Sequence, residues 1–168
     1  MSTENLHRDE AIRKLKTMID AIDIGMLCSG FSEGDYIHAV PMSRQEVDEE
    51  GNVWFLFSSE SESFQQLRKS NKVSLLYADT KSYSFLSLNG IAEISEDRGR
   101  IDKYWNKLVE AWFEKGKEDP RIRVLKVSPI EAHYWDTRSN KLVTFFKIAI
   151  NAVSGAKLDT GRQGDLNL

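Results

Sequence analysis

The chain has 168 residues, of which 29% are charged and 40% are apolar, and its formal net charge at pH 7 is −3. This length favours a single domain, and the composition is ordinary for a globular protein. The negative charge argues against a nucleic-acid partner, because proteins that bind a phosphate backbone usually carry a basic excess. No apolar run approaches the roughly 18 residues that a membrane-spanning helix needs, which argues against a membrane protein.

Two further features predict a cytoplasmic location. Residues 1–14 lack the apolar segment of a secretory signal peptide. Cys28 is the single cysteine, so the chain forms no intrachain disulfide of the kind that secreted proteins often use.

Apolar periodicity predicts a helix followed by two strands. Residues 2–23 carry one apolar helix face, with Ser2 or Thr3 as N-cap. The residues of this face are Ile12, Leu15, Ile19 and Ile22. Strands are expected over Ile24–Ser29 and Tyr36–Ser43. Because Pro41 has no backbone N–H, it must lie at an edge, a bulge or a strand end.

The central part of the chain predicts two buried strands separated by a short helix. The strands are Val53–Ser59 and Val73–Asp79, and the helix spans Ser61–Ser70 with Ser61 as N-cap and Asn71 as C-cap. Both strands are too apolar for a sheet with one solvated face. They favour the walls of a closed or two-layer β structure.

The second half predicts three more strands and a longer helix. The strands are Tyr83–Ile94, Val124–Trp135 and Leu142–Val153, with bulges indicated at Gly90 and Pro129. Asp97 is the expected N-cap of a long helix whose apolar stripe is Ile101, Trp105, Leu108 and Trp112. Residues 154–168 are polar and predict a loosely ordered tail.

About seven strands and three helices result, and short turns join most strand pairs. The pattern favours a mainly β fold with α elements (α+β), an antiparallel barrel whose openings are covered by helices. Residues 1–153 would form this single domain, including the N-terminal helix, and residues 154–168 would form the tail.

An ordered set of short segments resembles a known family. The segments are Val40–Met42, Gly51–Leu56, Lys72–Leu76 with Asp79, Tyr83–Gly90, Trp105, Trp112–Phe113, Gly116, Asp119–Pro120 and Tyr134–Asp136. In this order the chain resembles the general stress protein branch of the pyridoxamine 5′-phosphate oxidase-like proteins, over roughly Ala11–Val153. The resemblance implies a flavin-binding antiparallel split β-barrel. It also implies a homodimer that holds flavin mononucleotide (FMN) in a cleft between subunits, with flavin adenine dinucleotide (FAD) as the alternative.

The resemblance assigns candidate cofactor-binding residues to three places. Val40, Pro41 and Met42 would line the flavin ring, or they form an ordinary edge strand. Phe57, in the strand whose backbone would hold the ring, is a further candidate. The serines Ser58, Ser59, Ser61 and Ser63 would form a phosphate nest, or they form a polar strand-to-helix turn with an N-cap. Trp135 would lie over the cofactor across the dimer, or it serves core or dimer packing.

Two positions depart from the family's pattern. Relatives commonly carry Arg before the Pro-Met pair and Lys in the turn after the Trp-Phe strand, whereas this chain has Val40 and Ser63, with Glu60 and Glu62 nearby. A charge-assisted contact is worth about 1.5–3 kcal/mol, so losing two would weaken phosphate binding by several orders of magnitude. Serine hydroxyls, or Arg68 and Lys69 on the helix, remain as donors.

Two functions therefore stay open. The first is a flavin-dependent oxidoreductase that takes hydride from a nicotinamide cofactor, with no catalytic side chain assigned because the flavin carries the chemistry. The second is a dimeric binding or scaffold protein that has lost flavin. Three histidines and Cys28 show no metal-ligand spacing, so no metal site is expected, and haem binding through a strand histidine is a weaker alternative. Ser-His-Asp catalysis has no supporting local pattern.

Overall fold

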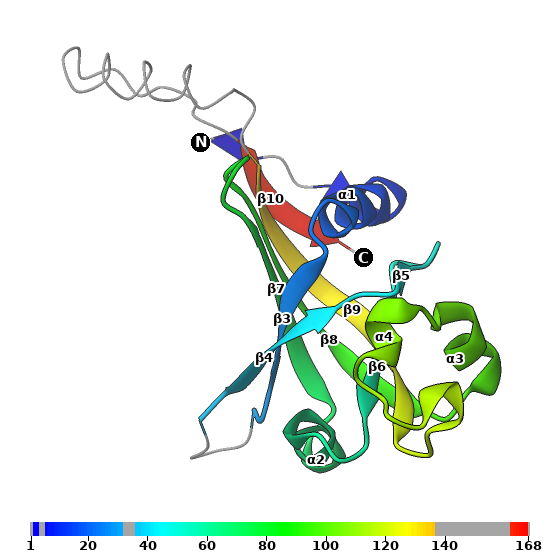
Figure 1. The fold of residues 1–168 in the computed structure, drawn as a ribbon. Helices are drawn as coiled ribbons and strands as arrows, with labels where there is room; N and C mark the ends of the chain where they lie inside the picture. Colours follow the sequence, from blue (N-terminus) through cyan, green and yellow to red (C-terminus); the bar gives the residue numbers. More distant parts are fainter. Residues whose placement is uncertain (1, 4–5, 32–35, 137–161, 168) are drawn as a thin grey trace.

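A strongly bent, mainly antiparallel sheet forms the body of the molecule, with helices at its ends and on one side (Figure 1). The structure, a computed structural model, describes residues 2–3, 6–31, 36–136 and 162–167. The strands are β1 (Ser2–Thr3), β2 (Leu6–His7), β3 (Ile24–Ser29), β4 (His38–Ser43), β5 (Glu46–Val47), β6 (Val53–Ser58), β7 (Lys72–Asp79), β8 (Ser84–Ser95), β9 (Ile122–Asp136) and β10 (Arg162–Asn167). The helices are α1 (Arg8–Asp20), α2 (Glu62–Lys69), α3 (Arg98–Tyr104), α4 (Lys107–Glu110) and the 3-10 helix η1 (Gly116–Glu118).

The long strand β9 connects the parts of the sheet. One of its edges pairs with β8, which continues through β7 and β3 to β4. Its other edge is divided, because β6 pairs with residues 122–127 and β10 pairs with residues 132–136. All of these pairs are antiparallel. The result is the predicted mainly β split barrel, in which β6 and β10 diverge from a common strand.

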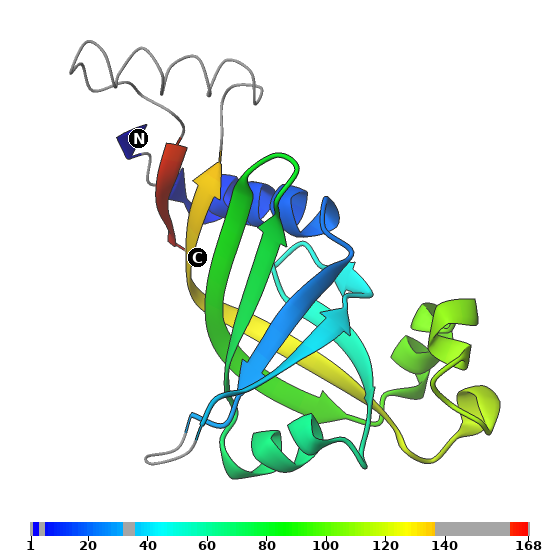
Figure 2. The ribbon, with the colours of Figure 1, turned by 60° about the vertical axis from the view of Figure 1, so that its left-hand side comes forward.

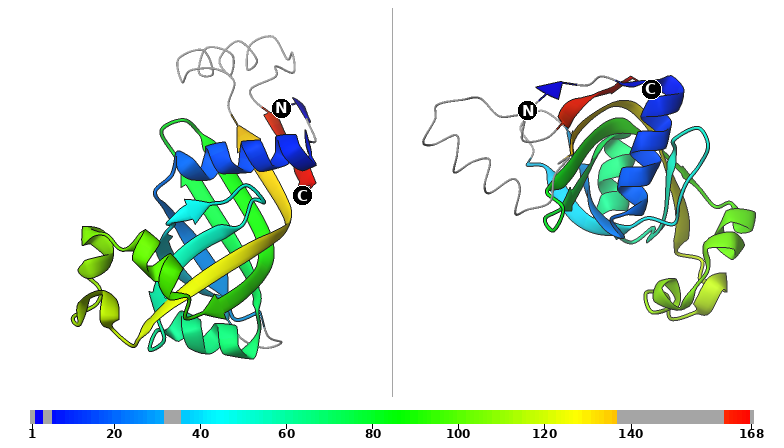
Figure 3. Two further views of the ribbon diagram at one scale, coloured as in Figure 1. Left: turned by 90° about the vertical axis from the view of Figure 1, so that its right-hand side faces the viewer. Right: turned by 90° about the horizontal axis from the view of Figure 1, so that it is seen from above.

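Helices close the two ends of the barrel, as predicted. Helix α1 lies across one end and inserts the fully buried Leu15 and Ile19 (Figure 3). Helix α2 covers the opposite end and inserts Leu67. Both helices are amphipathic, so their stability comes from packing one apolar face onto the barrel.

Strand β6 is apolar on both faces because it serves two cores. Val53, Phe55 and Phe57 point into the barrel core. Trp54 and Leu56 point outward into a second core under the side lobe, by which we mean residues 98–118 with α3, α4 and η1. Figure 2 shows this lobe projecting from the flank of the barrel. The second core explains why the strand lacks the polar face of a solvated sheet.

The two bulge signals meet in space, as expected. The β8–β9 register shifts between Asn89 and Gly90, and Gly90 lies opposite Pro129. A Cβ atom on Gly90 would lie 2.5 Å from the carbonyl oxygen of Ser128, so only glycine allows this backbone approach. Pro41 also lies where its chemistry requires, since β4 is an edge strand.

Other predictions of local structure are wrong. The first helix begins at Arg8, and residues 2–3 form a strand, so neither Ser2 nor Thr3 caps it. Helix α2 ends with Ser70 as C-cap in place of Asn71. Residues 162–167 of the expected loose tail form β10. The predicted strand Leu142–Val153 lies outside the described residues.

The predicted long helix after Asp97 is two short ones. Asp97 does cap α3, but Asn106 then accepts hydrogen bonds from the backbone N–H groups of Leu108 and Val109 and starts α4. The expected stripe is therefore broken. Trp105 packs toward Phe113 at 6.3 Å between ring centroids, whereas Leu108 and Trp112 are 78% and 83% exposed.

Replacing Gly90 with alanine tests the bulge. Gly90→Ala should lower the free energy of unfolding by about 2 kcal/mol, in the range of overpacked cores, because the new methyl group meets backbone that cannot move away. Gly99→Ala on the exposed face of α3 is the control and should change it by less than about 1 kcal/mol. Urea denaturation measures both; equal midpoints would contradict the assignment of the bulge.

Candidate functional site

The turn between β6 and α2 is built from serines that hydrogen-bond to one another. The carbonyl oxygen of Ser58 accepts from the Ser61 hydroxyl at 2.7 Å and from the Ser61 N–H at 3.0 Å. The Ser58 hydroxyl accepts from the N–H of Glu60 at 3.1 Å. Ser61 is the predicted N-cap, because its hydroxyl oxygen accepts from the N–H of Phe64 at 3.2 Å. These hydroxyls shape the turn.

The remaining candidates of this turn are anchored by their surroundings. The Ser59 N–H donates to the carbonyl oxygen of Arg121 at 2.8 Å, which continues the β6–β9 pairing beyond Ser58. Ser63 is buried in the first turn of α2. Phe57 is buried in the barrel core, and its ring packs against Phe64 with 6.0 Å between centroids. The side chain of Phe57 therefore serves the core.

Strand β4 presents its candidate residues on opposite faces. Val40 and Met42 point inward and pack on the barrel core, whereas Pro41 is exposed on the outer face opposite Met26. His38, at the start of β4, also points inward, and its Nδ1 lies 3.5 Å from a carboxylate oxygen of Glu62. This contact joins the start of β4 to the first residue of α2.

Trp135 lies far from the serine turn of its own chain. It pairs with Phe85 and Gln163, whereas Ser58 pairs with Ile122 at the other end of β9. The intervening strand is roughly 40 Å long at about 3.3 Å per residue. Trp135 can contribute to a site at the turn only from a second copy of the chain.

Carboxylates outnumber cations around the turn. Arg121 bonds Asp119 at 2.7 Å through one nitrogen and reaches Glu60 at 3.3 Å through another. Asp119 is 1% exposed, and its hydrogen bonds from Arg121 hold the pKa of its carboxyl well below the usual range. Glu62 adds a third carboxylate, facing His38.

This charge pattern does not fit a flavin phosphate. A phosphate group needs cations or free donors, yet Arg121 is already engaged by two carboxylates. Arg68 and Lys69 lie exposed in the last turn of α2, roughly 9 Å along the helix axis from its first residue, so they do not replace the absent cations. The flavin ring is uncharged but has a polar edge, so it needs a few hydrogen-bond partners in addition to apolar walls. The outer face beside Pro41 is apolar, with Met26 and Leu76 exposed in the same row.

Sequence reasoning missed a pair of polar atoms beside this turn. Ser29 and His38 are direct partners in the β3–β4 register and both point inward. Ser29 Oγ and His38 Nε2 are buried, and among the described residues they have no hydrogen-bond partner. Buried polar atoms usually find a partner, so this pair requires an explanation. Only the strand register reveals the pair.

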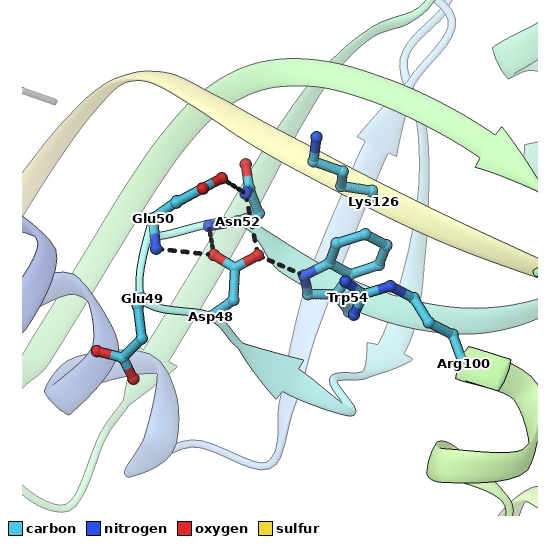
Figure 4. A pocket seen from close by; sticks show the side chains of 7 residues that line it. All are labelled: Asp48, Glu49, Glu50, Asn52, Trp54, Arg100 and Lys126. Carbon is cyan, nitrogen blue, oxygen red and sulfur yellow. Dashed lines mark hydrogen bonds between the residues drawn. The ribbon is translucent and has the colours of Figure 1, made fainter.

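A surface hollow of about 390 Å³ lies beside the β5–β6 hairpin (Figure 4). Its centre is Asp48, which accepts hydrogen bonds from the N–H groups of Glu50 and Asn52 and from the indole N–H of Trp54 at 2.8 Å. The guanidinium of Arg100 stacks over the Trp54 ring at 3.4 Å. Asp48, Trp54 and Arg100 thus contact one another, and the hollow belongs to the hairpin that attaches the side lobe to the barrel.

A second groove, of about 480 Å³, lies on the outer face of β8, β9 and β10. Ser87, His133 and Asp165 form one row across these strands, and His133 Nδ1 lies 2.5 Å from Asp165. This order resembles a hydrolase triad. However, the backbones of β8 and β9 pair with each other beside Ser87, so this part of the sheet offers no free N–H pair for an oxyanion.

The described residues contain no group of three or more His, Cys, Asp or Glu side chains that could hold a metal ion. His38 contacts Glu62 and His133 contacts Asp165, so the two strand histidines do not form one site.

Among the residues that the structure describes, no helix is both long enough and apolar enough to cross a membrane.

Comparisons with known proteins agree with the fold. The family model described as "Pyridoxamine 5'-phosphate oxidase like" matches residues 10–159. Protein bli-3 of Neurospora crassa is 24% identical over 157 residues, covering 88% of this chain and 75% of that protein. A general stress protein 26 from Bacillus anthracis is similar with a TM-score of 0.64 and 22% identity, covering 73% of this chain and 92% of that one. The general stress FMN/FAD binding protein of Xanthomonas citri is similar with a TM-score of 0.61 and 27% identity, covering 79% and 90%.

The divided β9 edge and the helix-closed ends define an antiparallel split β-barrel protein. Its structural neighbours include several general stress proteins. The chain belongs to the pyridoxamine 5′-phosphate oxidase-like family.

The ion pair beside the turn predicts a pH dependence. Because the pKa of Asp119 is lowered in the folded state, its stabilising contribution is complete above the unfolded pKa of about 3.9 and is lost as the pH falls through the folded value. Asp119→Asn should therefore lower the urea midpoint at pH 7, and the difference from wild type should shrink below about pH 4. Asp102→Asn, which removes an exposed pair with Lys117, is the control. A constant difference from pH 7 to pH 3 would contradict this account.

Proposed function

We propose that the protein is a homodimeric flavin-binding protein whose site lies between two subunits. The observation that carries this proposal is the family match, which spans the serine turn, β4 and Trp135. The relative from Xanthomonas citri is described as binding FMN or FAD. FMN is the cofactor that the family resemblance implies, and FAD is the alternative.

The proposed flavin site combines an outer face with a partner subunit. The ring would lie against Pro41 and the end of β6 at Ser58 and Ser59, with Trp135 of the partner subunit on its other side. Val40, Met42, Phe57 and Ser63 would support these groups from within. A bound flavin supplies the redox chemistry, and a nicotinamide cofactor is the proposed hydride donor. No side chain of this chain is assigned a catalytic role.

An apolar outer face supports the homodimer. Pro41, Met26 and Leu76 are neighbours in one row across β4, β3 and β7, and all three are exposed. Ile24 on β3 and Phe85 on β8 add further exposed apolar surface. This face comes forward in Figure 2, away from the side lobe. A contiguous exposed apolar patch of this kind is typical of a subunit interface.

The second function is a dimeric binding protein that has lost flavin. The observation that favours it is the excess of carboxylates over cations at the serine turn.

A cytoplasmic location also remains a proposal. It rests on the lone Cys28, which is buried and whose pKa is raised by that burial, as expected for an unreactive thiol.

The first test is flavin binding. The purified protein should show absorbance bands near ~450 nm or quench added flavin at micromolar concentration, at one flavin per subunit. The double variant Val40→Arg/Ser63→Lys should bind FMN more tightly than the native chain, because it restores two cations. Absence of binding to any flavin at about 1 mM would contradict the proposal and favour the second function.

The dimer has its own test. Light scattering at micromolar concentration should give the mass of two chains, and Leu76→Arg should shift it to one chain by placing charge in the apolar row. Leu108→Arg makes the same change at an exposed position of the side lobe and should leave the dimer intact. A folded wild-type monomer would exclude a site shared by two subunits.

A further inference from the structure

We propose that the groove on the outer face of β8, β9 and β10 binds a small organic cation, one with an ammonium or guanidinium group, beside the proposed flavin. The cation would be a second ligand of the shared site. Its place beside the flavin rests on the proposed function, whereas its binding to the groove does not. The inference gives a role to a groove of about 480 Å³ that neither the barrel core nor the apolar outer face uses.

One row of residues shows where the groove lies relative to the apolar outer face. The row crosses β4, β3, β7, β8, β9 and β10, and its neighbours are in direct register. Its first three residues are apolar and its last three are polar: Pro41, Met26, Leu76, Ser87, His133 and Asp165. Packing of two apolar halves about a two-fold axis would leave each polar half at the rim of the interface, where polar groups are usual. The groove therefore lies beside the proposed dimer face and outside its apolar centre.

The β8–β9 bulge gives the groove an apolar wall. The register shifts after the Asn89–Glu131 pair, and Ile130 is the residue that is left without a partner on β8. A bulge of this kind redirects a side chain that strict alternation would turn inward. Ile130 is accordingly 61% exposed and lines the groove next to Glu131. A ligand in the groove can therefore bury an apolar part against Ile130.

The polar lining of the groove is rich in hydrogen-bond acceptors. Asp165 lies 2.5 Å from His133 Nδ1 and favours a proton there, so in the uncharged imidazole Nε2 is an acceptor. Glu131 accepts from the side-chain amide of Asn89 at 2.8 Å through one oxygen. The second oxygen of Glu131 and Nε2 of His133 have no hydrogen-bond partner among the described residues. Of the described residues that line the groove, none is Lys or Arg.

This set of groups selects a ligand by its donors and its charge. An ammonium or guanidinium group only donates hydrogen bonds, so it complements a lining of acceptors. Glu131 and Asp165 attract positive charge, whereas they would repel a carboxylate or a phosphate. A metal ion is not the expected occupant, because the described residues contain no group of three or more His, Cys, Asp or Glu side chains that could hold one. The groove therefore fits an organic cation with an apolar part.

Trp135 connects the groove to the proposed flavin site. Its indole meets the His133 ring edge-on, with 4.5 Å between the ring centroids. The proposed function places Trp135 of the partner subunit over the flavin. The partner's His133, and the groove that it lines, would then lie beside the same flavin. A cation bound there would change the electrostatic environment of the flavin ring.

The first test compares probes that share an aromatic ring and differ in charge. Benzylamine, benzyl alcohol and benzoate are titrated against the full chain at neutral pH and low salt, with ligand-observed NMR as the readout. Benzylamine should bind with a Kd on the order of 1 mM, as expected for so small a ligand, and at least about tenfold more tightly than benzoate. Added salt should narrow this difference, because it screens the charges. Equal affinities for benzylamine and benzoate would overturn the inference.

Variants locate the bound cation. Glu131→Gln and Asp165→Asn should each weaken benzylamine several-fold, and Glu131→Lys should remove its advantage over benzoate. Ile130→Ser should weaken all the probes, because it removes the apolar wall. Glu110→Gln removes an equal charge from an exposed position of the side lobe and should change nothing. Circular dichroism and urea midpoints verify that each variant folds. Unchanged benzylamine binding in both Glu131→Gln and Asp165→Asn would overturn the assignment of the groove.

A second readout separates this inference from the proposed function. In the flavin-loaded protein, benzylamine should shift the absorbance bands of the bound flavin, and Glu131→Gln should reduce this shift. Free flavin with the same amine is the control. If the amine binds in the groove and the bands do not move, the groove is not beside the flavin and that part of the inference is wrong. If no flavin binds, the proposed function fails, and the NMR titration still decides whether the groove binds a cation.

Discussion

The division of one strand edge determines the architecture. A β-strand has two edges, but β9 has three principal partners because β6 and β10 share one edge end to end. The bulge at Gly90 and Pro129 lies between these two halves on the β8 side and allows the bend that separates them. The serine turn at the end of β6 and the Trp135 region beside β10 consequently lie at opposite ends of the molecule. A dimer can bring the serine turn of one chain beside the Trp135 region of its partner, which a single chain cannot do.

The serine turn shows how one residue type can serve two purposes. Hydroxyl groups at a strand-to-helix turn resemble a phosphate nest, yet here they satisfy the backbone of the turn itself. Charge decides between the two interpretations. A nest that binds anions has an excess of cations or free N–H groups, whereas this turn lies among Glu60, Glu62 and Asp119.

Much of the fold could be predicted from the sequence because it depends on local rules. Six long strands follow from apolar runs or apolar alternation, and the edge position of Pro41 follows from its missing N–H. The break at Asn106 could not be predicted, since the apolar stripe continues past it. The strand β10 carries no β-forming pattern in its sequence, and it pairs because β9 offers a free half-edge. Around the candidate site, the N-cap at Ser61 could be predicted because its signal is local, whereas the pairing of His38 with Ser29 could not, because it depends on cross-strand register.

The double burial of β6 has a consequence for how the chain folds. Trp54 and Leu56 pack in a second core that the side lobe completes, and the residues of this lobe come some forty positions later in the sequence. Until the lobe docks, β6 presents apolar side chains on a surface that will later be interior, and its outer edge pairs with only two residues of β5. Such a strand is prone to pair with strands of other chains. Docking of the lobe buries these apolar side chains, so it removes apolar surface that favours association with other chains during folding.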